Sequence, residues 1–244
     1  MPALIPAATA MLIRDGGQGL EVLLLRRSQA MDFAAGYWVF PGGRIDAEDY
    51  PGSHSDQHPD NQINKLSVSQ PPPEAIHTAA RQAAVRETYE EAQLQICPQQ
   101  LIPMSQWLAP KGMSKRFNTW FFIAEHNVND AVQVDNYEID NHRWCRPQQA
   151  LADFENQQLA MMPPTYVSLL ELARQATVAE ALAFYQSREP LRYAASYWLD
   201  AQQDRCMLYA GDAGYEANNA HIAGARHRLW ENGGTWIYEC DFLS

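Results

Sequence analysis

The chain has 244 residues, 46% of them hydrophobic and 11% aromatic, which is enough to bury the core of one large domain with an appendage. Its formal net charge of -11 would repel a phosphate backbone over most of the surface and argues against nucleic acid as a partner. No apolar stretch is long enough to cross a bilayer, and the first residues lack the basic region of an export signal, so we expect no membrane partner. The four cysteines are far apart and form no CxxC pair, which predicts reduced thiols in a cytoplasmic protein.

The first third of the chain predicts three strands. Two branched, apolar runs at residues 8–13 and 20–25 are separated by an Asp-Gly-Gly turn, which is typical of an antiparallel pair. A third, short strand at residues 38–40 should end where Pro41 removes a backbone donor and Gly42 frees the backbone to turn.

A polar segment separates these strands from the first helix. Residues 50–73 are rich in Pro, Ser, Asp, Asn and Gln, and we expect a flexible insertion there. Residues 74–94 have apolar side chains at helical spacing, a Pro-rich approach and an acid in the first turn, which predicts a helix.

The second half alternates further strands and helices and then becomes β-like. Strands are predicted at residues 119–124 and 142–145, and helices at 166–176 and 178–185. Beyond residue 191 an Asn-Gly-Gly turn between two apolar runs predicts a hairpin. The chain therefore reads as a mixed α/β protein with a C-terminal β appendage.

The helix at residues 74–94 carries the first functional signal. Glu87 lies three and four positions before Glu90 and Glu91, so all three carboxylates lie near one face. Their repulsion would be relieved by a divalent cation such as Mg²⁺, which prefers hard oxygen ligands, and Arg86 could hold a carboxylate by a charged hydrogen bond. A solvated acidic face is the alternative interpretation of such a pattern taken alone.

In its context the sequence resembles the Nudix box, written G-x5-E-x7-R-E-U-x-E-E-x-G-U with U a bulky aliphatic residue. Thr88 stands at one of the aliphatic positions, and Gln93 stands where the family has the glycine that ends the helix in the left-handed conformation. The residues that match the pattern are Gly43, Arg86, Glu87, Glu90, Glu91 and Leu94.

The box is interrupted by an insertion. Gly43 and Arg86 lie 43 positions apart where the pattern has 14, which leaves 29 additional positions. Asp49 occupies the place of the first box glutamate, so the box is opened just after it. Closing a longer loop costs only about 0.6 kcal/mol per doubling of its length, so such an insertion is tolerable.

The resemblance implies a fold and a set of roles. It implies an α/β/α sandwich with a mixed sheet over residues 1–187, followed by a β-rich extension at 188–244. It implies a Mg²⁺ (or Mn²⁺) cofactor and hydrolysis of a diphosphate linkage in a small-molecule nucleoside diphosphate derivative. The implied metal ligands are Glu87, Glu90, Glu91 and the Gly42 carbonyl, and the implied catalytic residues are Glu91, Arg86 and Glu138.

The general base is the least determined of these roles. Glu138 stands six positions before Trp144, a spacing found in antimutator members of the family, but an exposed loop acid is an equal alternative. Asp46 and Asp49 are rival candidates.

The substrate is indicated by residues before and after the box. Residues 23–28 and 40–43 resemble a signature of coenzyme A diphosphatases, although Leu25 replaces a threonine and Asp32 an arginine. Together with the insertion, segments such as residues 162–166 resemble the peroxisomal-type coenzyme A diphosphatases and imply coenzyme A or acyl-coenzyme A as substrate. The cations proposed to bind its anionic groups are Arg27, Arg44, Lys115 and Arg116.

Two alternatives remain open. Pro110 lies sixteen positions after Leu94, about where ADP-ribose hydrolases of the family carry a proline, which favours ADP-ribose or another nucleotide-sugar type diphosphate. A non-catalytic Nudix-fold binding module is the second alternative, although such proteins usually lose a box glutamate and this chain keeps all three.

Aromatic residues are concentrated in the C-terminal extension. Eight Tyr and Trp side chains between residues 193 and 238 are more than a short β segment can bury by itself. We favour a homodimer in which this segment contributes an apolar interface, because aromatic residues are frequent anchors of protein interfaces. Packing on the helices of the same chain is the alternative.

Overall fold

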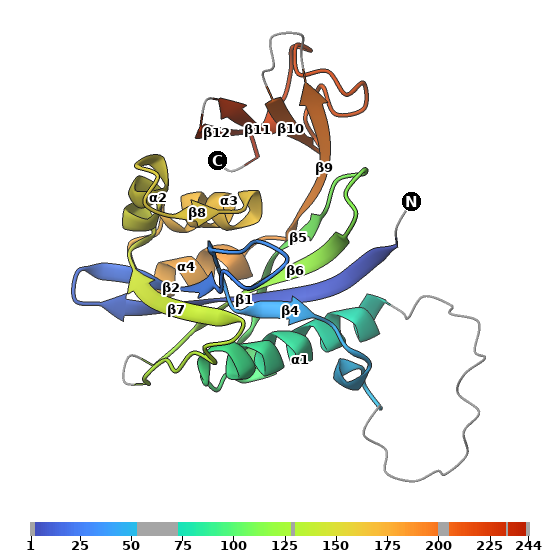
Figure 1. Cartoon of the computed structure of the whole chain (residues 1–244). Helices are drawn as coiled ribbons and strands as arrows, with labels where there is room; N and C mark the ends of the chain where they lie inside the picture. Colours follow the sequence, from blue (N-terminus) through green and yellow to red (C-terminus); the bar gives the residue numbers. More distant parts are fainter. Residues whose placement is uncertain (1–2, 53–72, 128–129, 200–204, 233, 243–244) are drawn as a thin grey trace, which may run out of the picture.

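A curled mixed sheet with helices on both faces forms the centre of the protein (Figure 1). The computed structural model describes residues 3–52, 73–127, 130–199, 205–232 and 234–242. The strands are β1 (Leu4–Gly16), β2 (Gly19–Arg27), β3 (Tyr37–Val39), β4 (Gly42–Arg44), β5 (Ile102–Leu108), β6 (Arg116–Glu125), β7 (Ile139–Cys145), β8 (Ala160–Met161), β9 (Leu191–Leu199), β10 (Arg205–Tyr209), β11 (His227–Asn232) and β12 (Thr235–Cys240). The α-helices are α1 (Pro73–Ala92), α2 (Pro147–Glu155), α3 (Pro163–Leu172) and α4 (Val178–Gln186), and two short 3-10 helices are η1 (Ala47–Asp49) and η3 (Pro98–Gln100).

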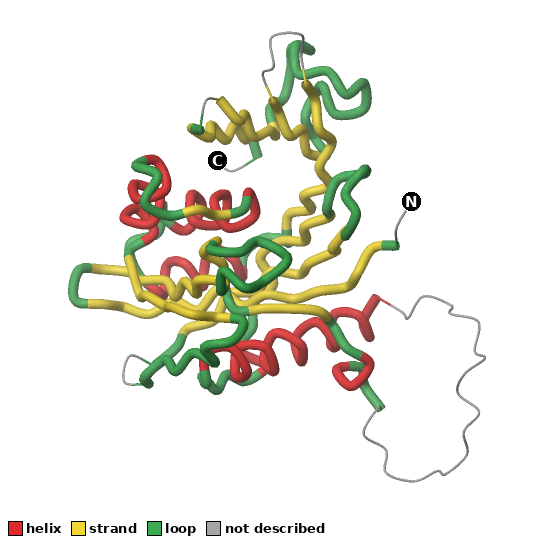
Figure 2. The backbone as a smooth tube through the Cα atoms, in the orientation of Figure 1, coloured by secondary structure: helices red, strands yellow, loops and turns green. Residues whose placement is uncertain are grey.

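The sheet has the order β12-β11-β10-β9-β5-β6-β1-β2-β3-β8, with β4 paired to β1 and β7 paired to β2. Strand β1 is central: it pairs in parallel with β6 and antiparallel with β2 and β4. The parallel pairing of β5 with β9 joins the C-terminal strands to this sheet, and Figure 2 shows β9 running from the central strands to the C-terminal ones at the top.

Alternation along β1 and β2 builds two separate cores. Ala8, Ala10 and Leu12 face the alanine-rich side of α1, whereas Met11 and Ile13 face a cluster that contains residues of α2, α3 and α4. Side chains of a strand point alternately to opposite faces, so one apolar strand can serve both layers. The predicted α/β/α sandwich with a mixed sheet is confirmed.

The structure differs from the predicted elements mainly at their ends. Helix α1 stops at Ala92, and Gln93 adopts the left-handed conformation with φ 56, as the glycine of the family pattern would. Helix α3 begins at Pro163, where a proline fits the first turn, and ends four residues before the predicted 176. Helix α2 and strand β5 were not predicted, and most of the predicted insertion lies outside the described residues.

The aromatic residues of the extension pack against the same chain. The rings of Trp107 and Tyr193 stack with centroids 3.9 Å apart and an interplanar angle of 2°, across the β5–β9 pairing. Tyr166 of α3 donates its hydroxyl to the Trp236 carbonyl at 2.8 Å. Strand β5 and helix α3 of the same chain therefore cover several of these rings, whereas Tyr197 is 50% exposed, and the homodimer stays a prediction.

A buried carboxylate ties the extension to the helices. Glu171 of α3 accepts hydrogen bonds from Tyr193 of β9 at 2.7 Å and from Tyr185 of α4 at 3.3 Å, and it pairs with Arg188. Glu171 is only 5% exposed, so these donors replace the water molecules that would otherwise hydrogen-bond its carboxylate. In the part of the chain that the structure describes, none of the helices is both long and apolar enough to cross a membrane.

We expect Glu171→Ala to lower the free energy of unfolding by about 3 kcal/mol, because it strands an arginine and two buried hydroxyl groups without their acceptor. Urea unfolding followed by circular dichroism would measure the change. Glu216→Ala removes an exposed carboxylate from the same extension and should stay within about 0.5 kcal/mol of the wild type. Equal stabilities of the two variants would contradict the proposed role of Glu171.

Candidate active site

The turn between β3 and β4 brings a backbone amide to the carboxylate helix. Strand β4 lies against β1 so closely that a Cβ on Gly42 would be 2.2 Å from the Thr9 hydroxyl and 2.5 Å from the Ala8 carbonyl, which only glycine avoids. The Gly42 amide then donates to Glu91 Oε2 at 2.9 Å. The Pro-Gly-Gly segment is therefore required for close packing against β1 and for holding Glu91.

Arg86 organises the other carboxylates. Its Nη1 donates to Glu87 Oε1 at 2.9 Å and to Glu90 Oε2 at 3.0 Å, and its Nη2 donates to the Arg44 carbonyl at 2.9 Å. Asp49 receives two further bonds, from Nε at 3.2 Å and Nη2 at 3.0 Å, in the bidentate geometry that arginine favours. Arg86 thus connects η1, β4 and α1.

Asp46 and Asp49 were rival candidates for the general base, and their positions differ. Asp49 is 6% exposed and has both oxygens occupied by the guanidinium of Arg86, so its contacts are those of a positioning residue. Asp46 lines the cavity described below and lies 3.7 Å from Arg86 with most of its side chain in solvent.

Glu91 is the most buried of the three helix carboxylates. Burial raises its pKa to about 8, and the Gly42 hydrogen bond and the Arg27 charge lower it only in part, while the charges of Glu87 and Glu138 raise it further. Burial also raises the pKa of Glu87, and the charge and hydrogen bond of Arg86 lower it only in part. Burial is therefore the main cause of both raised pKa values, and the neighbouring carboxylates add to it.

Glu138 reaches this cluster from the start of β7. Its backbone amide donates to Asp135 Oδ2 at 3.0 Å, and its carbonyl accepts from the Ser28 amide at 2.7 Å, which fixes the loop against β2. Its charge raises the pKa values of both Glu87 and Glu91. Glu138 thus lines the same cavity as Glu87 and Glu90, and its role as a general base stays a prediction.

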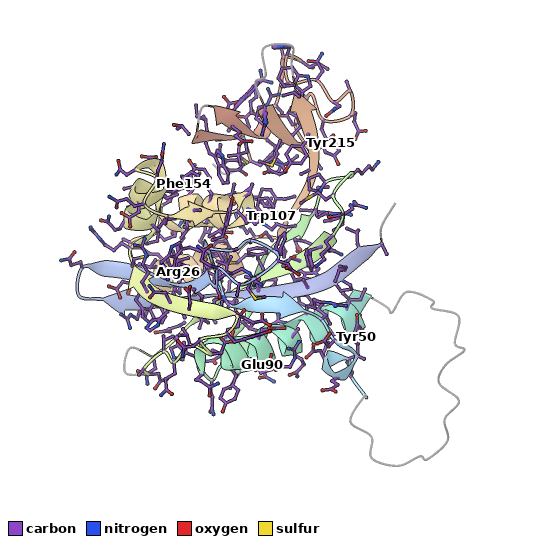
Figure 3. All side chains as sticks on the ribbon, in the orientation of Figure 1. Arg26, Tyr50, Glu90, Trp107, Phe154 and Tyr215 are labelled. Carbon is purple, nitrogen blue, oxygen red and sulfur yellow. The ribbon has the colours of Figure 1, made fainter. Side chains whose placement is uncertain are left out.

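The carboxylates open into a cavity of about 830 Å³. Glu87, Glu90, Arg86 and Glu138 line one end of it, and Figure 3 shows Glu90 on α1 and Trp107 farther up the molecule. An apolar end is formed by residues of β5, β6, the start of α3 and the C-terminal strands β9 and β10. This second end was not predicted, because its members are far apart in the sequence.

The predicted substrate-binding cations separate into two groups. Arg27, Arg44 and Lys115 line the cavity. The Arg116 guanidinium instead donates to the carbonyls of Ala109 and Pro110, holding the loop between β5 and β6, and Arg116 is not among the lining residues.

The donor set fits a hard divalent cation. Among the described residues no three carboxylate, imidazole or thiol groups already converge as metal ligands, because Glu87 and Glu90 turn to Arg86 and Glu91 accepts from Gly42. All available donors are oxygens, and Glu90 and Glu138 raise the pKa of Glu87 by their charge, a repulsion that a bound cation would relieve.

The arrangement can be compared with known proteins. No family model matches the chain. Acyl-coenzyme A diphosphatase NUDT19 of Xenopus laevis is 27% identical over 241 residues, covering 69% of this chain and 63% of that protein. The human protein of the same name is 23% identical over 246 residues, with coverage of 70% and 65%. The crystal structure of a Nudix hydrolase from Alicyclobacillus acidocaldarius superposes with a TM-score of 0.60 at 21% identity, covering 75% of this chain and 97% of that one.

These similarities support a Nudix protein, and the chain has the fold of a solved Nudix hydrolase. It resembles the coenzyme A diphosphatase branch, as the signature before the box predicts, and the solved structure shows that the fold is shared. The chain spans less than two thirds of the length of the two curated relatives.

Two features of this Nudix site were not evident from the sequence. Gly42 was predicted to offer its carbonyl to a metal, and the structure shows in addition that its amide holds Glu91. Asp49 was assigned to the place of a box glutamate, but its bidentate pairing with Arg86 becomes visible only once η1 lies beside α1. The sequence signal that pointed to Asp49 was its position, because it stands where the Nudix box has its first glutamate.

Burial of Glu91 predicts a pH-dependent stability. Its folded-state pKa is raised, so the metal-free protein should be most stable below the ordinary glutamate pKa and lose stability as the pH rises towards about 8. Glu91→Gln keeps an acceptor for the Gly42 amide without the charge. The melting temperature of this variant should exceed that of the wild type by several degrees at pH 8 and by much less at pH 5. A difference that does not change between these pH values would contradict the prediction.

Gly42 and Gly43 should respond differently to substitution. A Cβ on Gly43 would be 2.3 Å from Glu87 Oε1, at the end of a flexible type of side chain, whereas on Gly42 it meets backbone atoms of β1. We expect Gly43→Ala to displace the Glu87 carboxylate and weaken Mg²⁺ binding with little loss of stability. Gly42→Ala should instead lower the melting temperature. Calorimetric titration with Mg²⁺ and thermal unfolding would separate the two effects, and equal melting temperatures would refute the distinction.

Proposed function

We propose that this chain is a metal-dependent hydrolase that cleaves the diphosphate linkage of coenzyme A or acyl-coenzyme A. The observation that carries the proposal is the single cavity in which the box carboxylates meet a predominantly apolar opposite end. The similarity to proteins named acyl-coenzyme A diphosphatases supports the same substrate.

The metal would be Mg²⁺ or Mn²⁺, held by Glu87, Glu90 and Glu91 with the Gly42 carbonyl. When bound, such a metal supplies neutralisation of the diphosphate charge and activation of a water molecule. The protein holds the carboxylates that would bind the metal in defined positions. Gly42 fixes one oxygen of Glu91, and Arg86 positions Glu87 and Glu90.

Water would attack one phosphorus atom of the linkage and break the bond from that phosphorus to the bridging oxygen. The reaction releases two phosphate monoesters. Glu138 would accept the proton of the attacking water, a role supported by its position in the same cavity as Glu87 and by the effect of its charge on the pKa of Glu87. Arg27, Arg44 and Lys115 provide positive charge for the phosphate groups of the substrate.

A panel of diphosphates tests the function directly. Coenzyme A, acyl-coenzyme A, ADP-ribose, NADH and nucleoside triphosphates are each incubated with the protein and Mg²⁺, and products are separated by chromatography. We expect the highest kcat/KM for coenzyme A or its thioesters. Preference for ADP-ribose would favour the alternative suggested by Pro110, and no product from any member would favour a binding module.

Glu90→Gln should lower kcat by at least ~100-fold, the size of effect that follows the loss of one electrostatic group in an active site. Glu74→Gln is the matched control, because Glu74 is an exposed glutamate in the first turn of the same helix. Its rate should equal that of the wild type. A Glu90→Gln variant with wild-type kcat at saturating Mg²⁺ would exclude Glu90 from the proposed metal site.

A further inference from the structure

The apolar end of the cavity is built mainly from residues outside the box. We call it the apolar wall and define it by Trp107, Phe121, Met162, Ala195, Tyr197 and Met207. It combines β5 and β6, the residue before α3, and the C-terminal strands β9 and β10. The C-terminal strands meet the other segments because β9 pairs in parallel with β5.

One face of the antiparallel pair formed by β9 and β10 lines the cavity. In the antiparallel register Tyr197 lies opposite Met207 and Ala195 lies opposite Tyr209, so these four side chains share a face, and all four line the cavity. The other face, with residues such as Leu208, packs into a separate small cluster under the segment that follows β10. The extension therefore contributes a defined surface to the site.

Neighbouring aromatic rings and a buried carboxylate hold this surface in place. Tyr193 stacks on Trp107 at 3.9 Å, and its hydroxyl is fixed by the buried Glu171 of α3. Tyr209 packs edge-on against both Trp107 and Tyr193, with centroids 5.6 Å and 5.2 Å away. Helix α3, whose preceding residue Met162 also lines the cavity, is thus fixed to β5 and β9 by one network.

The composition of the apolar wall favours an alkyl chain. Its two Met side chains adapt to flexible apolar groups, and one face of the Trp107 ring is already covered by Tyr193. Recognition of a nucleobase uses hydrogen-bonding groups that meet the base edges, and the six side chains of the wall include only two with such a group, Trp107 and Tyr197. The Trp107 indole already donates to Ser105 at 3.1 Å.

The apolar wall is continuous with the carboxylate end. The cavity of about 830 Å³ lies in the upper part of the range for small-molecule sites, about 300–1,000 Å³. It therefore has room for more than a diphosphate and its metal. Tyr197 is 50% exposed, which leaves apolar surface at the mouth for a ligand to cover.

We propose that the apolar wall binds the acyl chain of an acyl-coenzyme A thioester, and that β9 and β10 set the preferred chain length. This inference rests on the proposed function, because it assigns one part of that substrate to one part of the cavity. The C-terminal extension then acts as a specificity element of the hydrolase.

A chain-length series tests the inference. The kcat/KM values of the wild type for coenzyme A and for its butanoyl, octanoyl and dodecanoyl thioesters should rise with length, by up to ~4-fold for each methylene that the wall covers. Ala195→Phe places a ring on the face of β9 that lines the cavity. It should lower the ratio of kcat/KM for the dodecanoyl thioester to kcat/KM for coenzyme A by at least ~10-fold relative to the wild type.

Ile237→Phe is the matched control, because it adds the same ring to an exposed position of β12 that does not line the cavity. It should keep the chain-length profile of the wild type. Thermal unfolding of both variants checks that they are folded, and Met207→Ala provides a second variant on the same face.

Binding without turnover separates this inference from the proposed function. In EDTA, calorimetric titration should show tighter binding of dodecanoyl-coenzyme A than of coenzyme A, and Ala195→Phe should remove the difference. A flat chain-length profile with equal binding of both ligands would overturn the inference even if coenzyme A is hydrolysed. Failure to hydrolyse any diphosphate, with the binding difference retained, would overturn the proposed function alone.

Discussion

The candidate site depends on the guanidinium group of Arg86. Three carboxylates and one backbone carbonyl converge on it from η1, β4 and α1. Without this cation, Glu87 and Glu90 would face each other on one turn of a helix, and the buried Asp49 would have no partner for its charge. Because Arg86 donates to each of them, the helix can keep a dense set of negative charges close to the cavity.

A second buried charge supports the apolar end of the cavity. Glu171 gathers hydroxyl groups from α4 and β9 together with Arg188, and through Tyr193 it supports the Trp107 side of the cavity. The extension is therefore not an independent unit in its contacts, since its strands continue the central sheet and share a core with α2, α3 and α4. The two ends of the cavity are fixed by separate polar networks that are joined through the sheet.

The sequence predicted those features that depend on local spacing. Glu87, Glu90 and Glu91 lie on one helix, so their common face follows from helical periodicity, and the hairpin before residue 240 follows from its turn residues. The contact of Glu91 with Gly42 joins positions 49 residues apart, and the apolar wall requires the parallel pairing of β5 with β9. Such contacts are set by the packing of the whole sheet, which no local pattern specifies.

The pairing of Asp49 with Arg86 also explains how the box can be interrupted. These residues are 37 positions apart, and segment 53–72 lies between them. Asp49 is in η1, before that segment, and Arg86 is in α1, after it. The ion pair therefore joins the two elements that flank the segment. Because the cost of closing a loop grows only slowly with its length, the insertion changes the stability of this contact little. The geometry of the carboxylates is thus set by the ends of the insertion and not by its length, so a Nudix site can be kept across an interrupted box.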